Sequence, residues 1–89
     1  MDKNLDLELF EAASSGDLQR VKTALEKGAN ANYANGDGRT SLMRASKRGY
    51  EEIVKLLIDN GADVRLRDNK NKTALMGACK KGYLKIAKY

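Results

Sequence analysis

The chain has 89 residues, a formal net charge of +5, 42% hydrophobic residues and 33% charged residues. This length allows one domain with a small core, and the absence of histidine excludes catalysis by a histidine base and metal binding by imidazole. Cys79 is the single cysteine, which excludes a disulfide framework and a cluster of thiolate ligands and agrees with a reducing compartment.

The first part of the chain predicts two short helices. Apolar residues at helical spacing predict one helix over residues 5–14 and a second over residues 18–27, with an interruption at Gly16. The second helix has its apolar residues on one side only. A helix of this kind has one neighbour, as in the terminal cap of a stack of repeats.

The middle of the chain predicts a loop followed by two helices. Residues 35–38 concentrate asparagine, aspartate and glycine, which accept positive φ, so residues 28–39 are interpreted as an extended excursion with a tight hairpin at its tip. Thr40 offers a hydroxyl at the N-cap of the next helix, which Gly49 ends. The helix over residues 51–59 is apolar around most of its circumference, so we expect it to pack on both sides in the middle of the stack.

The last part of the chain predicts a similar series. A turn over residues 68–71 contains Asn71, which can adopt the left-handed conformation in place of a glycine, and Thr73 is the expected N-cap of the following helix. Cys79 is assigned to packing within that helix. The final predicted helix reaches Tyr89 after little more than a turn, so the array is expected to end within a repeat.

These similarities define an internal repeat with a step of 33 residues. The step also places Leu9, Ala12 and Gly16 opposite residues of the central copy, so a weaker first copy is present. The matched pairs of the second and third copies are Thr40 with Thr73, Leu42 with Leu75, Met43 with Met76, Ala45 with Ala78, Gly49 with Gly82, Tyr50 with Tyr83, and Ile53 with Ile86.

The repeat resembles the ankyrin repeat in its 33-residue period of turn, helix, turn and helix. The central copy GDGRTSLMRASKRGYEEIVKLLIDNGADV, the last copy GADVRLRDNKNKTALMGACKKGY and the first copy FEAASSGDLQRVKTALEKGANAN show the resemblance. It implies an all-α repeat solenoid in which stacked helix-turn-helix repeats are joined by β-hairpin-like loops. We expect a single domain over residues 1–89, with an N-terminal cap repeat at 5–27, a second repeat at 28–60 and a truncated third at 61–89.

The chain departs from the family pattern at the start of each first helix. The usual Thr-Pro-Leu-His appears as Thr-Ser-Leu-Met at Thr40 and as Thr-Ala-Leu-Met at Thr73. The proline that starts the helix and the histidine that hydrogen-bonds the turns are both missing. We therefore expect looser turns and lower stability, with the methionines filling apolar space in place of the polar network.

Charge is unevenly distributed along the chain. Residues 1–36 hold four basic and six acidic side chains, whereas residues 37–89 hold thirteen and six, so the two parts carry −2 and +7. The resemblance implies a concave groove formed by the hairpin tips and first helices, where most of this positive charge would lie. The partner-binding candidates are Arg39, Arg44, Lys47, Arg48, Arg67, Lys70, Lys72, Lys80 and Lys81.

Nothing in the sequence supports an enzyme. Glu51 and Glu52 begin a helix, where they compensate the helix dipole, and Gly36-Asp-Gly is interpreted as a hairpin because no phosphate-loop Gly-Lys-Ser/Thr follows it. Tyr50 and Tyr83 are expected to pack under the turns.

The leading hypothesis is a non-enzymatic protein-protein interaction module. Its basic groove would bind an acidic or phosphorylated partner segment, without a cofactor, through charge pairs that salt weakens. The alternatives are binding of nucleic-acid phosphates, which lacks interleaved exposed aromatic residues, and a structural fragment of a longer array. Self-association through the exposed C-terminal repeat is a further alternative.

The sequence also predicts a compartment. No apolar run approaches the roughly 18 residues of a spanning helix, and the acidic start MDKNLDLE lacks the regions of a signal peptide. We therefore expect a soluble intracellular protein without membrane insertion, in the cytoplasm by default and with the nucleus as an alternative.

Overall fold

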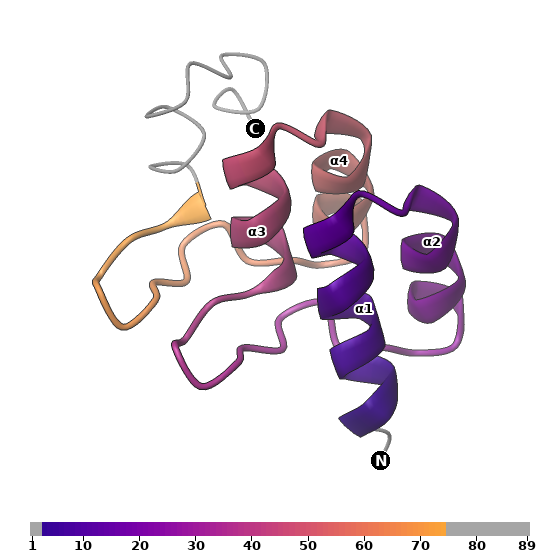
Figure 1. Ribbon diagram of the computed structural model, residues 1–89, viewed down its shortest axis with the longest axis horizontal. Coiled ribbons are helices and arrows are strands. Elements are labelled where there is room, and N and C mark those ends of the chain that lie inside the picture. Colours follow the sequence, from indigo (N-terminus) through magenta and orange to yellow (C-terminus); the bar gives the residue numbers. More distant parts are fainter. Residues whose placement is uncertain (1–2, 75–89) are drawn as a thin grey trace.

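Four helices in two layers form the part of the chain that the computed structural model describes, residues 3–74 (Figure 1). Helices α1 (Lys3–Ser15) and α3 (Ser41–Arg48) lie side by side in one layer, and α2 (Leu18–Glu26) and α4 (Glu51–Asp59) form the other. Each pair joined by a short turn also packs together, α1 on α2 and α3 on α4. The observed helices confirm the predicted ones to within a few residues.

Hydrogen-bonding side chains define where α2 and α3 begin. Asp17 Oδ1 accepts the N–H of Arg20 at 3.2 Å at the start of α2. At the start of α3, Thr40 Oγ1 accepts the N–H of Met43 at 3.3 Å, and Gly49 ends the helix at a φ of 79°. Both features of α3 confirm the prediction.

Met43 corrects one expectation about the missing histidine. Its side chain is buried, as predicted, but its sulfur also accepts the N–H of Thr40 at 3.4 Å. One polar contact is therefore kept at a position where the sequence predicts only apolar filling. The contact is a weak one, because a thioether sulfur is a poor acceptor.

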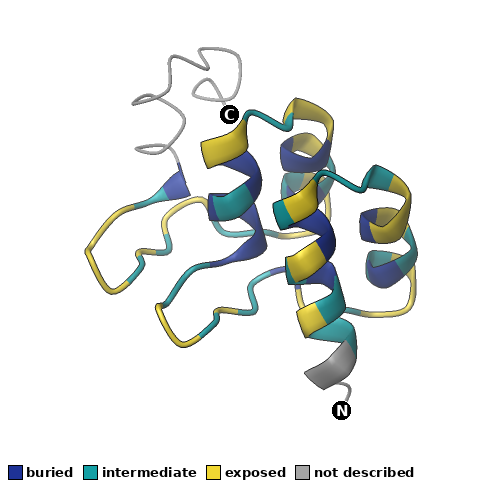
Figure 2. Ribbon diagram, viewed as in Figure 1, coloured by how far each residue is buried: buried dark blue, intermediate teal, exposed yellow. Residues whose placement is uncertain are grey.

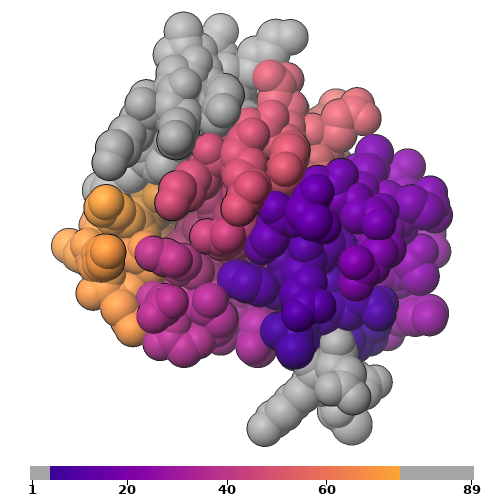
Figure 3. Space-filling view, viewed as in Figure 1, coloured from indigo at the N-terminus to yellow at the C-terminus, as the bar shows by residue number. Residues whose placement is uncertain are grey.

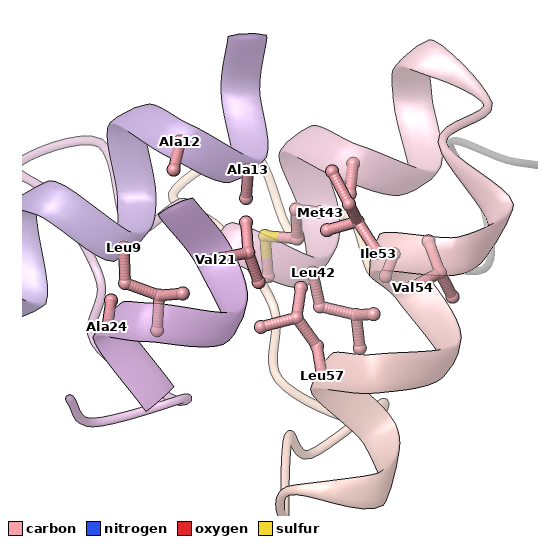
Figure 4. Packing of buried hydrophobic residues seen from close by; sticks show 12 residues of the cluster. Leu9, Ala12, Ala13, Val21, Ala24, Leu42, Met43, Ile53, Val54 and Leu57 are labelled. Atoms are coloured by element: carbon pink, nitrogen blue, oxygen red, sulfur yellow. The ribbon is translucent and has the colours of Figure 1, made fainter. Parts of the chain in front are cut away.

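The core lies between the two layers and is shared by all four helices (Figure 4). Large side chains from different copies meet there, whereas Ala12 and Ala13 of α1 and Ala45 and Ser46 of α3 are small buried side chains that let these helices approach closely. The buried side chains of this cluster are Leu9, Ala12, Ala13, Val21, Ala24, Leu42, Met43, Ala45, Ile53, Val54, Leu57 and Ala74.

Tyr50 packs against the turn between α1 and α2, which confirms its predicted packing role. Gly16 in that turn has a φ of +83°, and a Cβ built on it would lie 2.8 Å from the Tyr50 ring. The ring thus fills the space that only a glycine leaves open. Because Gly16 belongs to the first copy and Tyr50 to the second, the contact connects neighbouring copies.

Asn71 has a φ of 64°, which confirms that it replaces a glycine in the second loop. The predicted helices of the third copy, with Cys79, Tyr83, Lys80 and Lys81, lie outside the described residues. The capping role of Thr73 stays a prediction, since the helix that it would begin lies there too.

Comparison of Gly16→Ala with Gly28→Ala tests the close approach of Tyr50. Both glycines have positive φ, at +83° and +96°, but no atom lies within 4 Å of a Cβ built on Gly28. We expect about 1 kcal/mol of destabilisation at Gly28 from the backbone alone and about 2–4 kcal/mol at Gly16, where ring and Cβ overlap. Urea unfolding of both variants measures the difference, and equal losses would contradict the packing role of the ring.

Ser41 provides a second test of the core. Its side chain is fully buried and its Oγ has no hydrogen-bond partner among the described residues. Because an unsatisfied buried hydroxyl is unfavourable, Ser41→Ala should raise the free energy of unfolding by about 1 kcal/mol and the Tm by roughly 4–8 °C.

The neighbouring hydroxyl is the matched control, since Thr40→Ala removes a helix cap and should lower stability by about 1 kcal/mol. A thermal melt in which both variants are destabilised would mean that the Ser41 hydroxyl is satisfied in solution.

Candidate partner-binding surface

Two loops have the same pattern of hydrogen bonds: the first loop, residues 27–40, lies between α2 and α3, and the second loop, residues 60–73, follows α4. In the first, Asn35 Oδ1 accepts hydrogen bonds from the backbone N–H groups two and four residues later, at 3.0 and 2.9 Å. In the second, Asp68 Oδ1 accepts from the same relative positions at 2.8 and 2.9 Å. Residues with positive φ, Gly38 and Asn71, lie at equivalent points of the two loops. A single isolated bridge, between Ala34 and Thr40, is formed within the first loop.

Direct hydrogen bonds hold the tips of the two loops together. The backbone N–H of Asn69 donates to the carbonyl oxygen of Asp37 at 2.9 Å, and its side-chain amide donates to that of Gly36 at 3.1 Å. A Cβ built on Gly38 would lie 2.7 Å from Asn69 Oδ1, so the loops touch. Because the tips are bonded, the backbones that carry the basic residues of the two loops have fixed positions relative to each other.

The bases of the loops are joined by Asn32. Its side-chain amide donates to the carbonyl oxygen of Gly61 at 3.1 Å, and its Oδ1 accepts the N–H of Asp63 at 2.7 Å. One asparagine side chain thus connects the first loop to the turn after α4, and the two successive copies are bonded at the base as well as at the tips.

The four basic candidates of the loops differ in their surroundings. Arg39 is an internal partner, because its Nε lies 3.9 Å from Asp68 Oδ2 and its side chain is 32% exposed. Arg67 is exposed, although its Nη1 donates to the carbonyl oxygen of Asn71 at 3.1 Å. Lys70 and Lys72 are exposed.

The three basic candidates of α3 lie along its outer side. Arg44 is half-buried, and its Nε donates to Ser14 Oγ at 3.4 Å, across to α1. Lys47 and Arg48 are exposed in the last turn of α3, where positive charge compensates the helix dipole. The side chain of Arg48 makes no hydrogen bond or ion pair with the residues that the structure describes.

The loops and the first-layer helices share one face of the molecule. Figure 3 shows α1, α3 and the two loops together on this face, and Figure 2 shows exposed residues along α1 and at the end of α3. Seven of the nine candidates belong to α3 and the two loops, which share this face, while Lys80 and Lys81 lie outside the described residues.

Asp68 organises the second loop and was not among the residues singled out from the sequence. The backbone N–H of Lys72 is the main cause that lowers its pKa below the ordinary value, helped by the N–H of Lys70 and the charge of Arg39, whereas burial acts in the opposite direction. Its place opposite Asn35 in the 33-residue repeat is the signal that could have identified it.

The opposite layer carries a different feature. A shallow pocket of about 180 Å³ lies between α2 and α4, lined by Leu18, Lys22, Glu52, Lys55, Leu56 and Asp59. It contains none of the basic candidates and has side chains of both charges. Within residues 3–74 no group of acidic or cysteine side chains is placed to hold a metal ion.

Stacked helix pairs with bonded loops define the class of the protein as an α-helical repeat solenoid. Residues 9–89 match the family model of ankyrin repeats in 3 copies, so the chain belongs to the ankyrin repeat family. The match confirms the predicted fold class, while the boundaries of the single repeats stay predictions. Ankyrin repeats mediate protein binding and are typically non-catalytic.

No curated protein matches the chain significantly. None of the described helices combines the length and the apolar character that crossing a membrane requires.

The lowered pKa of Asp68 predicts that acid loosens the second loop. A carboxylate with a depressed folded-state pKa contributes stability above its unfolded pKa, and this contribution is lost as the pH falls through the folded value. We therefore expect the amides of Lys70 and Lys72 to lose protection below the ordinary carboxyl value of 3.8. Hydrogen exchange followed by NMR measures this effect.

The first loop is the internal control, because Asn35 makes the same bonds without a titrating group. Asp68→Asn should make the second loop behave like the first. Parallel loss of protection in both loops of the unmodified protein would instead indicate global unfolding and contradict the local role of Asp68.

Proposed function

We propose that the chain is a protein-binding module that takes an acidic or phosphorylated segment of its partner on a basic surface. We define the basic surface as the candidate residues of α3 and the two loops, with the predicted residues of the third copy as its continuation. Its members are Arg39, Arg44, Lys47, Arg48, Arg67, Lys70, Lys72, Lys80 and Lys81.

One observation carries the proposal: positive charge accumulates on this face without acidic neighbours in the same segment. Residues 39–50, which form the end of the first loop and all of α3, contain four basic and no acidic side chains. A patch of one sign attracts ligands of the opposite sign. Ankyrin repeats in general bind proteins, which makes an acidic protein segment the ligand that fits best.

Compensation of the helix dipole does not account for the whole basic surface. It explains Lys47 and Arg48 in the last turn of α3. It does not explain Lys70 and Lys72, which lie exposed in a loop. They belong to a loop on the same face as α3, which supports a role in binding.

Arg44 and Arg48 suit different parts of an acidic ligand. Arg44 is held by Ser14 through one guanidinium nitrogen, so its direction is restrained before binding. Arg48 is exposed at the helix end, where its planar guanidinium can bind a carboxylate or phosphate with two parallel hydrogen bonds. Salt screens exposed pairs of this kind, so binding should weaken as ionic strength rises.

A charge reversal of exposed residues tests this function. The variant Lys47→Glu, Arg48→Glu, Lys70→Glu, Lys72→Glu should lose affinity for a fluorescent glutamate-rich peptide by roughly tenfold or more, since each exposed pair contributes up to about 1 kcal/mol. Fluorescence anisotropy at low and physiological salt measures the loss, and a lysine-rich peptide should not bind the unmodified protein.

The matched control reverses four exposed basic residues of the opposite layer and its edge, Arg20, Lys22, Lys27 and Lys55. An equal loss in both variants would show that only net charge matters. Tighter binding of a random-sequence oligonucleotide than of the acidic peptide would instead favour the nucleic-acid alternative.

A further inference from the structure

The first helix is longer at its N-terminus than its counterpart in the second copy. α1 begins at Lys3, whereas α3 begins at Ser41, which is equivalent to Glu8 by the 33-residue step. The extra helical turn of α1 therefore occupies positions that form a loop in the next copy. Asp6 fixes it, because Asp6 Oδ1 accepts the N–H of Asn30 at 2.7 Å.

The N-terminal half of α1, which includes this extra turn, leaves apolar side chains on the surface. Leu7 is 42% exposed, and Phe10, three residues later on the same side of the helix, is partly exposed. The Phe10 ring packs edge-on against Tyr33, with ring centroids 6.2 Å apart and an interplanar angle of 78°. Leu7, Phe10 and Tyr33 form what we call the apolar step.

The apolar step lies on the same side of α1 as the contact with Arg44. Ser14, which accepts the Arg44 hydrogen bond, is two helical turns from Leu7 and so lies above it on one side of the helix. The distance along the axis is about 10 Å. The apolar step therefore lies about two helical turns from the point where Arg44 of the basic surface contacts α1.

An acidic residue, Glu11, lies on α1 between the apolar step and the contact with the basic surface. Glu11 is exposed and lies between Leu7 and Ser14 on this side of α1, four residues after the first and three before the second. It occupies the position that Arg44 has in the second copy. An acidic ligand group is thus attracted over α3 and repelled over α1, where an uncharged apolar group is favoured.

We propose that the partner segment has two parts, an acidic or phosphorylated run over the basic surface and a bulky apolar side chain that covers the apolar step. An extended segment advances about 3.3 Å per residue, so the two parts are separated by about three residues. This inference rests on the proposed function and specifies the chemistry of the partner.

The test uses peptides that carry the glutamate run alone or with one leucine placed about three residues before or after it. One of the leucine peptides should bind the unmodified protein on the order of tenfold more tightly than the same peptide with serine in place of leucine. Leu7→Ala should abolish this gain and leave the affinity for the glutamate run unchanged.

Val64→Ala is the matched control, because Val64 is a large apolar side chain of similar exposure, 38%, in the connection after α4. It should keep the gain from leucine. Thermal melts check that both variants are folded, and alanine at position 7 preserves helix propensity.

Two results would overturn the inference and leave the proposed function standing. One is equal affinity for the leucine and serine peptides while charge reversal still abolishes binding. The other is a uniform loss of affinity for all peptides in Leu7→Ala, which would mean a structural role for Leu7. If no acidic peptide binds the unmodified protein, the proposed function fails and this inference fails with it.

Discussion

Burial of apolar side chains between successive helix pairs is the interaction on which the rest of this structure depends. One helix pair leaves an apolar face uncovered, and only a neighbouring pair can cover it. The core cluster accordingly combines residues of all four helices with Ala74 of the third copy. Small side chains such as Ala13 and Ala45 let α1 and α3 approach, and Gly16 admits the Tyr50 ring. The loops that carry the charged residues take their positions from this packing.

Hydrogen bonds from backbone N–H groups to side-chain oxygens, rather than the ladder of a β-sheet, determine the shape of the two loops. Backbone N–H groups in an exposed excursion need acceptors, and Asn35 and Asp68 supply two bonds each from one oxygen. The basic side chains of the loops fall into two groups, those with partners inside the protein and those exposed without one among residues 3–74. Arg39 forms an ion pair with Asp68, and Arg67 donates a hydrogen bond to a carbonyl oxygen. The side chains of Lys70 and Lys72 are exposed and donate no hydrogen bond to the described residues. Under the proposed function, these lysines contribute more to binding than Arg39.

Local features of this fold could be predicted from sequence, and so could the packing of Tyr50 against a turn, but the polar side-chain pairs between copies could not. The cap at Thr40, the stop at Gly49 and the left-handed Asn71 depend on neighbours in the chain, and all three are confirmed. The Arg39–Asp68 pair and the Arg44–Ser14 bond join side chains of different copies. A 33-residue period indicates which face a residue occupies but not where a long flexible side chain ends.

The same period separates structural positions from positions that distinguish the copies. Leu9 and Leu42 are equivalent, and both are buried in the core. Glu11 and Arg44 are equivalent too, but they lie at the surface and carry opposite charges. A stack of identical copies would present the same surface at every step, and a ligand could bind in several registers. Under the proposed function, the reversal of charge between adjacent copies, next to the apolar side chain of Leu7, gives the face a direction, and a ligand with one acidic and one apolar part would then bind in one register.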